Sequence, residues 1–317
     1  MAVQLERGIE DAASSGRHVP RGRDPRVGPG WAIAAIGSLI ALAAFAPSGL
    51  YLIGFLGLII VAHEGGHYVL ARRAGMRPTE FYWGFGPEIC SIRVDDCRFG
   101  VRVLFLGGYV RLEGMTPRSE LPDGFPESGT FRAATVGGRL STILAGPAVN
   151  LVMAWLAFTA AVVIGGGSVL TAPVDGLGDV WFVLAATAEA LWLWVDNLGG
   201  YLMALADTSG RTEPPVRFLS PVAQADVSRQ AVGQGLASSL QWFGILSSAI
   251  GAINLLPLPP LDGSHAAAAA GEGTIRRLTG RNVRLDVTRL VPLAYLTVGI
   301  LVALSVSALV LDLRDLA

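Results

Sequence analysis

The chain has 317 residues, of which 52% are hydrophobic and 15% are charged, and its mean hydropathy is +0.51. Soluble domains carry about 25% charged residues, so this composition excludes an ordinary soluble protein and indicates an integral membrane protein. The formal net charge of −1 gives no reason to expect a nucleic-acid partner. All 24 basic residues are arginines, which together with abundant alanine and glycine suggests a bacterial source.

Apolar stretches divide the chain into expected membrane spans. Residues 1–30 are polar and basic, and we expect a disordered cytoplasmic tail there, followed by a single membrane domain over 31–317. A transmembrane helix needs about 20 mostly apolar residues. The stretches that approach this length are 31–46, 50–73, 135–165, 236–257 and 289–311.

Arginine clusters fix the expected orientation of these spans, because cytoplasmic loops are enriched in basic residues. Clusters at 17–26, 72–77 and 276–284 place the N-terminus in the cytoplasm and the C-terminus outside the cell. The segment 166–217 is then extracellular or re-entrant. Its apolar part, 180–206, is expected to be a re-entrant or interfacial helix, since a sixth crossing would move the last arginine cluster outside.

Region 77–115 has a different pattern, typical of a β-hairpin. The stretches ICSIRV and RFGVRVLFL alternate in polarity on either side of Asp95 and Asp96, as two strands joined by a tight turn do. The sequences GFGP (84–87) and GG (107–108) punctuate this region. The expected fold class is therefore an all-α polytopic membrane protein with about five transmembrane helices and a small membrane-associated β-hairpin.

The sequence HEGGH lies at 63–67, inside the expected second span. A charged side chain near the bilayer centre costs about 2.5–3.5 kcal/mol, so these residues need a compensating partner. On a helix, His63 and His67 share a face and can bind one zinc ion, and Glu64 beside it can accept a proton from water. The alternative is a chance match in which both histidines are hydrogen-bonded in a helical core.

A catalytic zinc ion has three protein ligands and one open position. The third ligand should be His265 or a carboxylate at the same depth. Asp262 in NLLPLPPLDGSH follows prolines that prevent a regular helix, and irregular backbone at membrane depth occurs where it is buried in protein or lines a cavity. A different protease of the H-E-x-x-H type would use a glutamate, but Glu88, Glu113 and Glu189 lack this setting.

HEGGH together with NLLPLPPLDG resembles the site-2 protease family of intramembrane zinc metalloproteases. Other stretches similar to bacterial members follow in the family's order: EFYWGFGPEI (80–89), FGVRVLFLGGYVRLEGMTP (99–117), LAGPAVN (144–150) and SPVAQADVSRQA (220–231). The resemblance covers roughly residues 50–165 and 218–312. The interval 166–217 is too short for the PDZ domain that many bacterial members carry, so the chain resembles a PDZ-less member.

The resemblance implies one zinc ion per chain, held by His63, His67 and Asp262. It implies Glu64 as the general base and Asn254 as a substrate-binding residue, whereas His265 is not a ligand in the family pattern. The implied substrates are single-pass proteins of the cell membrane, such as an anti-sigma factor, a membrane-bound regulator or a signal-peptide remnant. These would be cut in or near their transmembrane segments, within the lipid bilayer, in regulated intramembrane proteolysis.

Two other classes of protein fit parts of the pattern. A metal or proton transporter would line several spans with ionisable residues, but 31–46 and 135–165 carry almost none. A non-catalytic membrane-binding homologue would be expected to lack the base or a ligand. For a protease, we expect the edge of the hairpin around 85–106 to hold the substrate as an extended strand, with Gly84 and Gly86 allowing close backbone approach.

Overall fold

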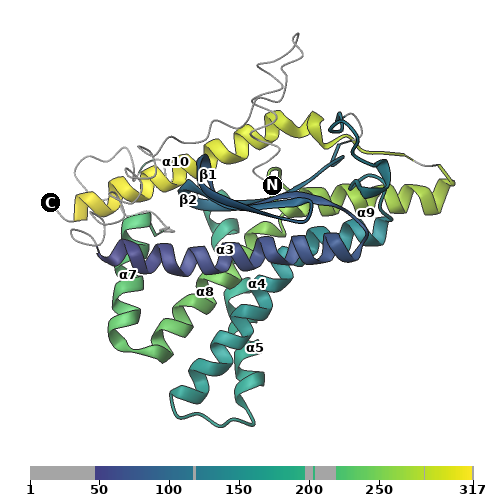
Figure 1. The fold of residues 1–317 in the computed structure, drawn as a ribbon. Helices are drawn as coiled ribbons and strands as arrows, with labels where there is room; N and C mark the ends of the chain where they lie inside the picture. The colour runs from purple at the N-terminus through teal and green to yellow at the C-terminus, as the bar shows by residue number, and fades with distance from the viewer. Residues whose placement is uncertain (1–46, 117–118, 197–202, 204–218, 282, 316–317) are drawn as a thin grey trace. The chain divides into compact units, whose positions relative to one another are not determined.

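The computed structural model describes residues 47–315 except 117–118, 197–202, 204–218 and 282 (Figure 1). The expected tail 1–30 and the expected span 31–46 lie outside these residues. In chain order the structure contains α3 (Pro47–Arg73), β1 (Pro78–Val94), β2 (Cys97–Leu112), a short 3-10 helix η1 (Glu127–Gly129), α4 (Val136–Ile164), α5 (Ala172–Asp196), α7 (Pro221–Gln234), α8 (Leu236–Asn254), α9 (Asp262–Thr279), η2 (Val287–Leu290) and α10 (Val291–Asp315).

Among the described residues, five helices are long and apolar enough to cross a bilayer: Ser48–Arg73, Val136–Ile164, Ala172–Leu193, Leu236–Asn254 and Val291–Asp312. This confirms the expected fold class of a helical membrane protein with a small β-hairpin. Four of the five helices coincide with expected spans. The fifth, α5, lies where we expected a re-entrant or interfacial helix, and it is a continuous helix of 25 residues.

The end of α3 shows why the chain turns from helix to strand at residue 75. The backbone N–H of Gly75 donates to the carbonyl of Arg72, and that of Met76 donates to the carbonyl of Ala71. This is the Schellman arrangement, in which a glycine in the left-handed region ends a helix, and Gly75 has a φ of 81°. Met76 is buried in the apolar cluster that follows, so the chain enters β1 at a fixed angle.

Strands β1 and β2 form the expected hairpin, and the pairing of Val94 with Cys97 places Asp95 and Asp96 at its turn. Both strands are bent, which makes the pairing more complex than a simple ladder. Residues 78–83 pair with 108–112 on one side, and residues 80–83 also pair with 98–101. Residues 98–101 in turn pair with 90–93. The stretch 98–101 is therefore interior, and 108–112 has no strand on its other side among the described residues.

An aromatic cluster holds the hairpin against α3. The ring of Tyr68 on α3 lies 6.1 Å from that of Phe81 on β1 and 5.3 Å from that of Phe99 on β2, in edge-to-face geometry. Aromatic pairs at these distances contribute about 0.5–1.5 kcal/mol beyond the area that they bury. Gly57 provides another close contact, because a β-carbon there would lie 2.7 Å from the ring of Trp83.

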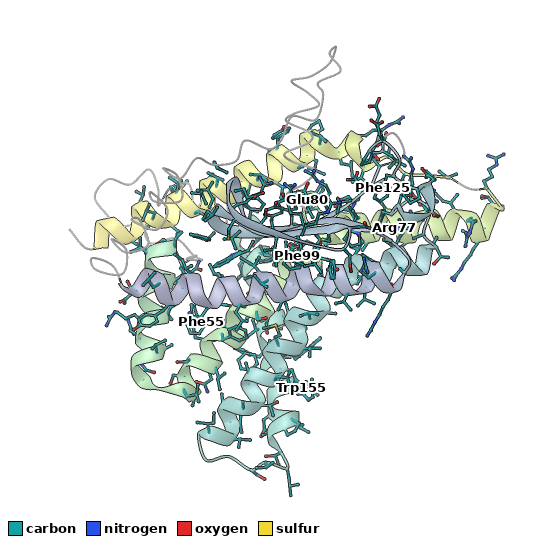
Figure 2. The ribbon with its side chains drawn as sticks, viewed as in Figure 1. Phe55, Arg77, Glu80, Phe99, Phe125 and Trp155 are labelled. Atoms are coloured by element: carbon teal, nitrogen blue, oxygen red, sulfur yellow. The ribbon has the colours of Figure 1, made fainter. Side chains whose placement is uncertain are left out.

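The chain divides into two compact units. The first contains Leu56–Asn150 and Asn254–Tyr295, and it holds the hairpin and the candidate site. The second contains Leu151–Ile253 with the first turns of α3 and most of α10. In the second unit α4 packs on α5 through Ala154, Phe158 and Val180, and the indole N–H of Trp155 donates to the carbonyl of Pro173 at 2.9 Å (Figure 2).

The arrangement of spans leads to a prediction about topology. Arginines 72 and 73 end α3, and arginines 276 and 277 end α9, so α3 and α8 should both run toward the cytoplasm. Because α5 lies between α4 and α8, a single crossing by α5 would reverse α8. We therefore expect reporters fused after residues 75 and 280 to read cytoplasmic and one fused after residue 172 to read extracellular. A cytoplasmic reading at 172 would contradict this topology.

Candidate metal centre

The close approach of α3 and α4 creates the site. A β-carbon at Gly66 of α3 would lie 2.7 Å from the carbonyl oxygen of Ala145 on α4. A β-carbon at Gly146 would overlap Nε2 of His67 and lie 2.6 Å from Nε2 of His63. Small residues allow two helices to pack backbone against backbone in membranes. Here they bring α4 against the face of α3 that carries both histidines.

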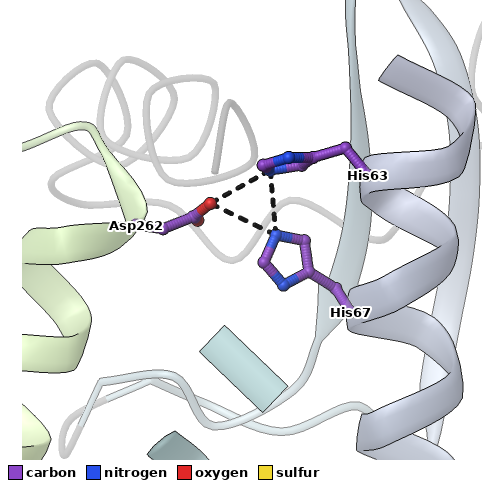
Figure 3. A group of neighbouring side chains, drawn as sticks. All are labelled: His63, His67 and Asp262. Atoms are coloured by element: carbon purple, nitrogen blue, oxygen red, sulfur yellow. Dashed lines mark hydrogen bonds and ion pairs between the residues drawn. The ribbon is translucent and has the colours of Figure 1, made fainter. Parts of the chain in front are cut away.

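Asp262 reaches the same point from the first residue of α9. The chain leaves α8 at Asn254 and turns through a proline-rich stretch before α9 begins. Gly263 is necessary in this turn, because a β-carbon there would overlap the carbonyl oxygens of Leu255 and Leu256. Figure 3 shows the Asp262 carboxylate directed at the two imidazoles, with Oδ2 3.0 Å from Nε2 of His63 and 3.3 Å from Nε2 of His67.

The three ligand atoms have the spacing that a zinc ion requires. The two Nε2 atoms of His63 and His67 lie 3.2 Å apart, so the triangle has sides of 3.0, 3.2 and 3.3 Å. Zinc binds nitrogen and oxygen at about 2.0–2.2 Å in a tetrahedron, which places its ligand atoms about 3.3–3.6 Å apart. The triangle is slightly smaller than one face of that tetrahedron. Among the described residues, this is the group of histidine, cysteine and carboxylate side chains that could hold a metal ion.

The hydrogen bonds around His67 also favour a cation at this point. Nδ1 of His67 lies 2.7 Å from the carbonyl oxygen of Thr142, which can only accept, so Nδ1 carries the proton. Nε2 of the neutral ring is then an acceptor, and it faces the acceptor oxygen of Asp262. Two buried acceptors 3.3 Å apart repel each other unless a cation lies between them. A backbone carbonyl that orients a histidine in this way is the usual second partner of a metal-bound imidazole.

Burial and charge act in opposite directions on Asp262. Burial alone would raise the pKa of its carboxyl, but positive charge at the two imidazoles, carried by a proton or by a metal ion, lowers that pKa below its usual range. The carboxylate is therefore ionised, which is the form that binds metal. Both histidines and Asp262 are at most 9% exposed.

Glu64 lines the same small pocket as His67 and Asp262. The pocket is lined by Glu64, His67, Val110, Leu112, Met115, Thr142, Ile143, Asp262 and His265. A β-carbon at Gly108 would lie 3.1 Å from Cγ of Glu64, so β2 passes directly beside this side chain. His265 is buried, and burial lowers its pKa to about 4, which keeps the ring neutral. It does not belong to the group whose ligand atoms converge.

The other residues expected from the sequence have distinct positions. Asn254 is the last residue of α8 and is partly buried. Gly84 and Gly86 have φ angles of 95° and 78°, and a β-carbon at Gly84 would lie 2.8 Å from the carbonyl oxygens of Arg102 and Leu104. Gly84 is thus required by the bend of the hairpin itself, and a role in contacting substrate stays a prediction.

Sequence reasoning missed two contributors to the site, Thr142 and Gly146. Gly146 lies in LAGPAVN, a stretch noted above for its resemblance, but nothing in that stretch identifies which residue touches the histidines. Thr142 acts through its backbone carbonyl, and a carbonyl leaves no signature in the residue type.

The fold and site together define a polytopic helical membrane protein with a buried cluster of two histidines and one carboxylate that could hold a metal ion. The model of peptidase family M50 matches residues 51–298, and the chain belongs to this family.

Individual relatives match about a third of the chain. A Clostridium acetobutylicum protein named as a zinc metalloprotease is 35% identical over 102 residues, which are 32% of this chain and 28% of that protein. The zinc metalloprotease Rip1 of Mycobacterium tuberculosis is 38% identical over 105 residues, which are 33% of this chain and 26% of Rip1. The chain thus spans about a quarter of the length of these curated relatives.

The contact at Gly146 gives a sharp prediction. Gly146→Ala adds a methyl group that overlaps Nε2 of His67 and lies 2.6 Å from Nε2 of His63, so the histidines must move and stoichiometric zinc binding should be lost. The matched control is Gly137→Ala on the same helix, where a β-carbon meets nothing within 4 Å. Zinc content of the two purified variants checks this. Equal, full zinc content in both would contradict the geometry described here.

Proposed function

We propose that this protein is a zinc metalloprotease that hydrolyses peptide bonds in or near the transmembrane segments of other membrane proteins. The observation that carries the proposal is the triangle of ligand atoms from His63, His67 and Asp262, with Glu64 in the same pocket. Membership of peptidase family M50 supports the chemistry, and the zinc metalloprotease names of the relatives support the metal. Five apolar helices support a membrane setting.

The proposed ligands leave one coordination position open. Zinc bound there would polarise the scissile carbonyl and make a water molecule acidic enough to lose a proton near neutral pH. The Glu64 carboxylate accepts this proton while the water oxygen attacks the carbonyl carbon. Glu64 then delivers the proton to the amide nitrogen as the carbon–nitrogen bond breaks, so that a carboxyl and an amine are released. Asn254 is proposed to donate a hydrogen bond to the substrate main chain.

Two kinds of variant test this assignment. Asp262→Ala and His67→Ala should lose stoichiometric zinc, because two ligands do not hold the ion. Glu64→Gln should retain zinc, since it preserves the size of the side chain, but cleavage of a membrane peptide should fall by about 10²–10⁴-fold, the usual contribution of a general base. Zinc analysis and a cleavage assay on the same preparations give both readings. A Glu64→Gln enzyme with normal cleavage would remove Glu64 as the base, and full zinc in Asp262→Ala would remove Asp262 as a ligand.

Measurements of zinc transport and peptide cleavage separate a protease from the other two classes of protein. A metal transporter should move zinc across vesicle membranes and should show no peptide cleavage at all. A non-catalytic homologue should bind zinc and membrane proteins without cutting them. The chemistry of Glu64 beside a three-ligand site favours hydrolysis over both.

The substrate must be presented as an extended strand. In a helix the carbonyls are occupied by hydrogen bonds, and in lipid each unsatisfied backbone group costs several kcal/mol. An open sheet edge can replace those bonds by β-addition. Among the described residues the stretch 108–112 has a strand on one side only, and it carries the pocket residues Val110 and Leu112. Only part of the expected edge 85–106 qualifies, because 98–101 is paired on both sides.

Single prolines along the edge test this binding mode. Along a strand, successive N–H groups point to opposite sides, so at alternate positions within 109–112 the N–H faces away from 78–83 and its loss breaks no backbone hydrogen bond of the hairpin. At those positions proline should retain zinc but reduce cleavage, whereas proline at Gly100 or Val101 should disrupt the interior of the sheet. Zinc content and cleavage are measured together. If every zinc-retaining variant within 109–112 cleaves normally, the edge does not hold the substrate.

The substrates proposed are single-pass proteins such as an anti-sigma factor, a membrane-bound regulator or a signal-peptide remnant. The segment 166–217 is short in comparison with a PDZ domain, so recognition of the substrate is proposed to depend on the membrane segment and the strand edge. The proposed location is the cell membrane, with the N-terminus in the cytoplasm and the C-terminus outside.

A further inference from the structure

Helix α9 carries Asp262 at its first residue, but hydrophobic packing does little to fix its position. Its buried residues are Asp262, Gly263, Ser264, His265, Ala269 and Glu272. None of them has a large apolar side chain, and alanine and glycine surfaces offer few interlocking contacts that would resist rotation or sliding. Another interaction must therefore set where the Asp262 carboxylate lies.

Glu272 provides a second buried ionic cluster on the same helix. Its Oε2 accepts from Nη1 of Arg139 at 2.7 Å and from Nη1 of Arg284 at 3.3 Å. Its Oε1 accepts from the backbone N–H of Leu285 at 2.8 Å. Glu272 is 6% exposed and Arg139 is 5% exposed, so both partners of the shortest pair are buried. This carboxylate is not part of the metal centre.

The two acidic residues of α9 face the same side of the helix. Asp262, His265, Ala269 and Glu272 are spaced by three, four and three residues, which places them on one stripe. Asp262 and Glu272 are ten residues apart, or about 15 Å along the axis. A rotation or shift of α9 that moves Glu272 therefore moves Asp262 as well.

Arg139 connects this cluster to the part of α4 that orients the histidines. Arg139, Thr142 and Gly146 are spaced by three and four residues on one face of α4. Thr142 accepts from His67, and Gly146 touches both imidazoles. Helix α4 thus contacts both parts of the site. It binds His67 through the carbonyl of Thr142, and it binds α9 through the pair of Arg139 with Glu272.

A buried carboxylate cannot leave its cationic partner without a large loss of free energy, because an uncompensated charge would remain in the interior. The ion pair therefore constrains α9 much more strongly than its alanine stripe does. We propose that Glu272 is a positioning residue, whose ion pair with Arg139 sets the rotation and axial position of α9 and so places the Asp262 carboxylate opposite His63 and His67. This inference rests on the proposed zinc centre.

The test is the zinc dissociation constant of the full-length protein in detergent or nanodiscs, measured by competition with a chromophoric chelator. Glu272→Gln keeps the shape of the side chain and an acceptor for Leu285 but removes the charge. We expect it to raise the dissociation constant by about ten- to a hundredfold, the range found when a partner that orients a metal ligand is removed. Arg139→Gln should have an effect of similar size. The double variant Glu272→Gln, Arg139→Gln should bind zinc as tightly as the single variant with the higher dissociation constant, because each substitution removes the same interaction.

A matched control distinguishes positioning from general loss of an ion pair. Glu127 and Arg132 form a more exposed pair at 2.7 Å in the segment before α4. The backbone carbonyl of Arg132 accepts from Arg284 of the Glu272 cluster, but a change at the Glu127 side chain leaves that carbonyl in place. Glu127→Gln should leave the dissociation constant unchanged. Glu272→Asp is a second probe that keeps the charge but shortens the side chain, so α9 must shift to keep the pair, and zinc binding should weaken here too.

The outcomes separate this inference from the zinc centre itself. If Asp262→Ala binds zinc as the unmodified protein does, the proposed centre fails. If Asp262→Ala loses zinc while folded Glu272→Gln keeps the unmodified dissociation constant, the centre stands and the positioning role is wrong. Should Glu272→Gln not fold, the result for Glu272→Asp decides, and an unchanged dissociation constant there overturns the inference.

Discussion

The crowding of two imidazole nitrogens and a carboxylate oxygen within about 3 Å of one another is the constraint on which the rest of the structure depends. In a largely apolar protein the Nε2 acceptor of His67 and the Asp262 carboxylate repel each other and are poorly solvated, and a cation between them removes that repulsion. Each neighbouring element is organised to make this possible. α3 supplies both histidines from one face, α4 supplies the carbonyl that orients His67, and α8 ends early so that α9 can begin with Asp262.

Glycine has a different function at each place where the backbone must come close. Two adjacent glycines in α3 weaken the helix by about 2 kcal/mol relative to alanine. Gly66 offsets this cost by allowing contact with α4, whereas a β-carbon at Gly65 meets nothing within 4 Å. Gly146 leaves room for the histidine nitrogens, and Gly263 lets α9 start against the last carbonyls before it. A single methyl group at Gly66, Gly146 or Gly263 would therefore act on the metal centre without changing any ligand.

The sequence predicted those parts of the site that depend on local spacing. His63 and His67 share a face because they are four residues apart on a helix, and the Asp95–Asp96 turn follows from alternating strands around it. Asp262 lies 199 residues after His63 in the sequence. Its pairing with the histidines was implied by the family resemblance and not by spacing. The contacts of Gly146 and Thr142, the double pairing of 98–101 and the cluster around Glu272 could not be predicted, because each depends on the packing of distant segments.

The strand edge at 108–112 explains how one small site could accept an extended chain. Gly108 passes beside Glu64, and Val110 and Leu112 line the pocket, so a strand added at 108–112 would run past the proposed base. Along such a strand successive carbonyls point to opposite sides, and half of them can bond to the edge while the others face away from it. A carbonyl that faces away keeps its oxygen free for the metal centre. A helix cannot offer this, because its carbonyls are all bonded along one direction. Unwinding of the substrate onto this edge is therefore a geometric requirement of the proposed chemistry, and its cost in lipid falls as the edge replaces the lost hydrogen bonds.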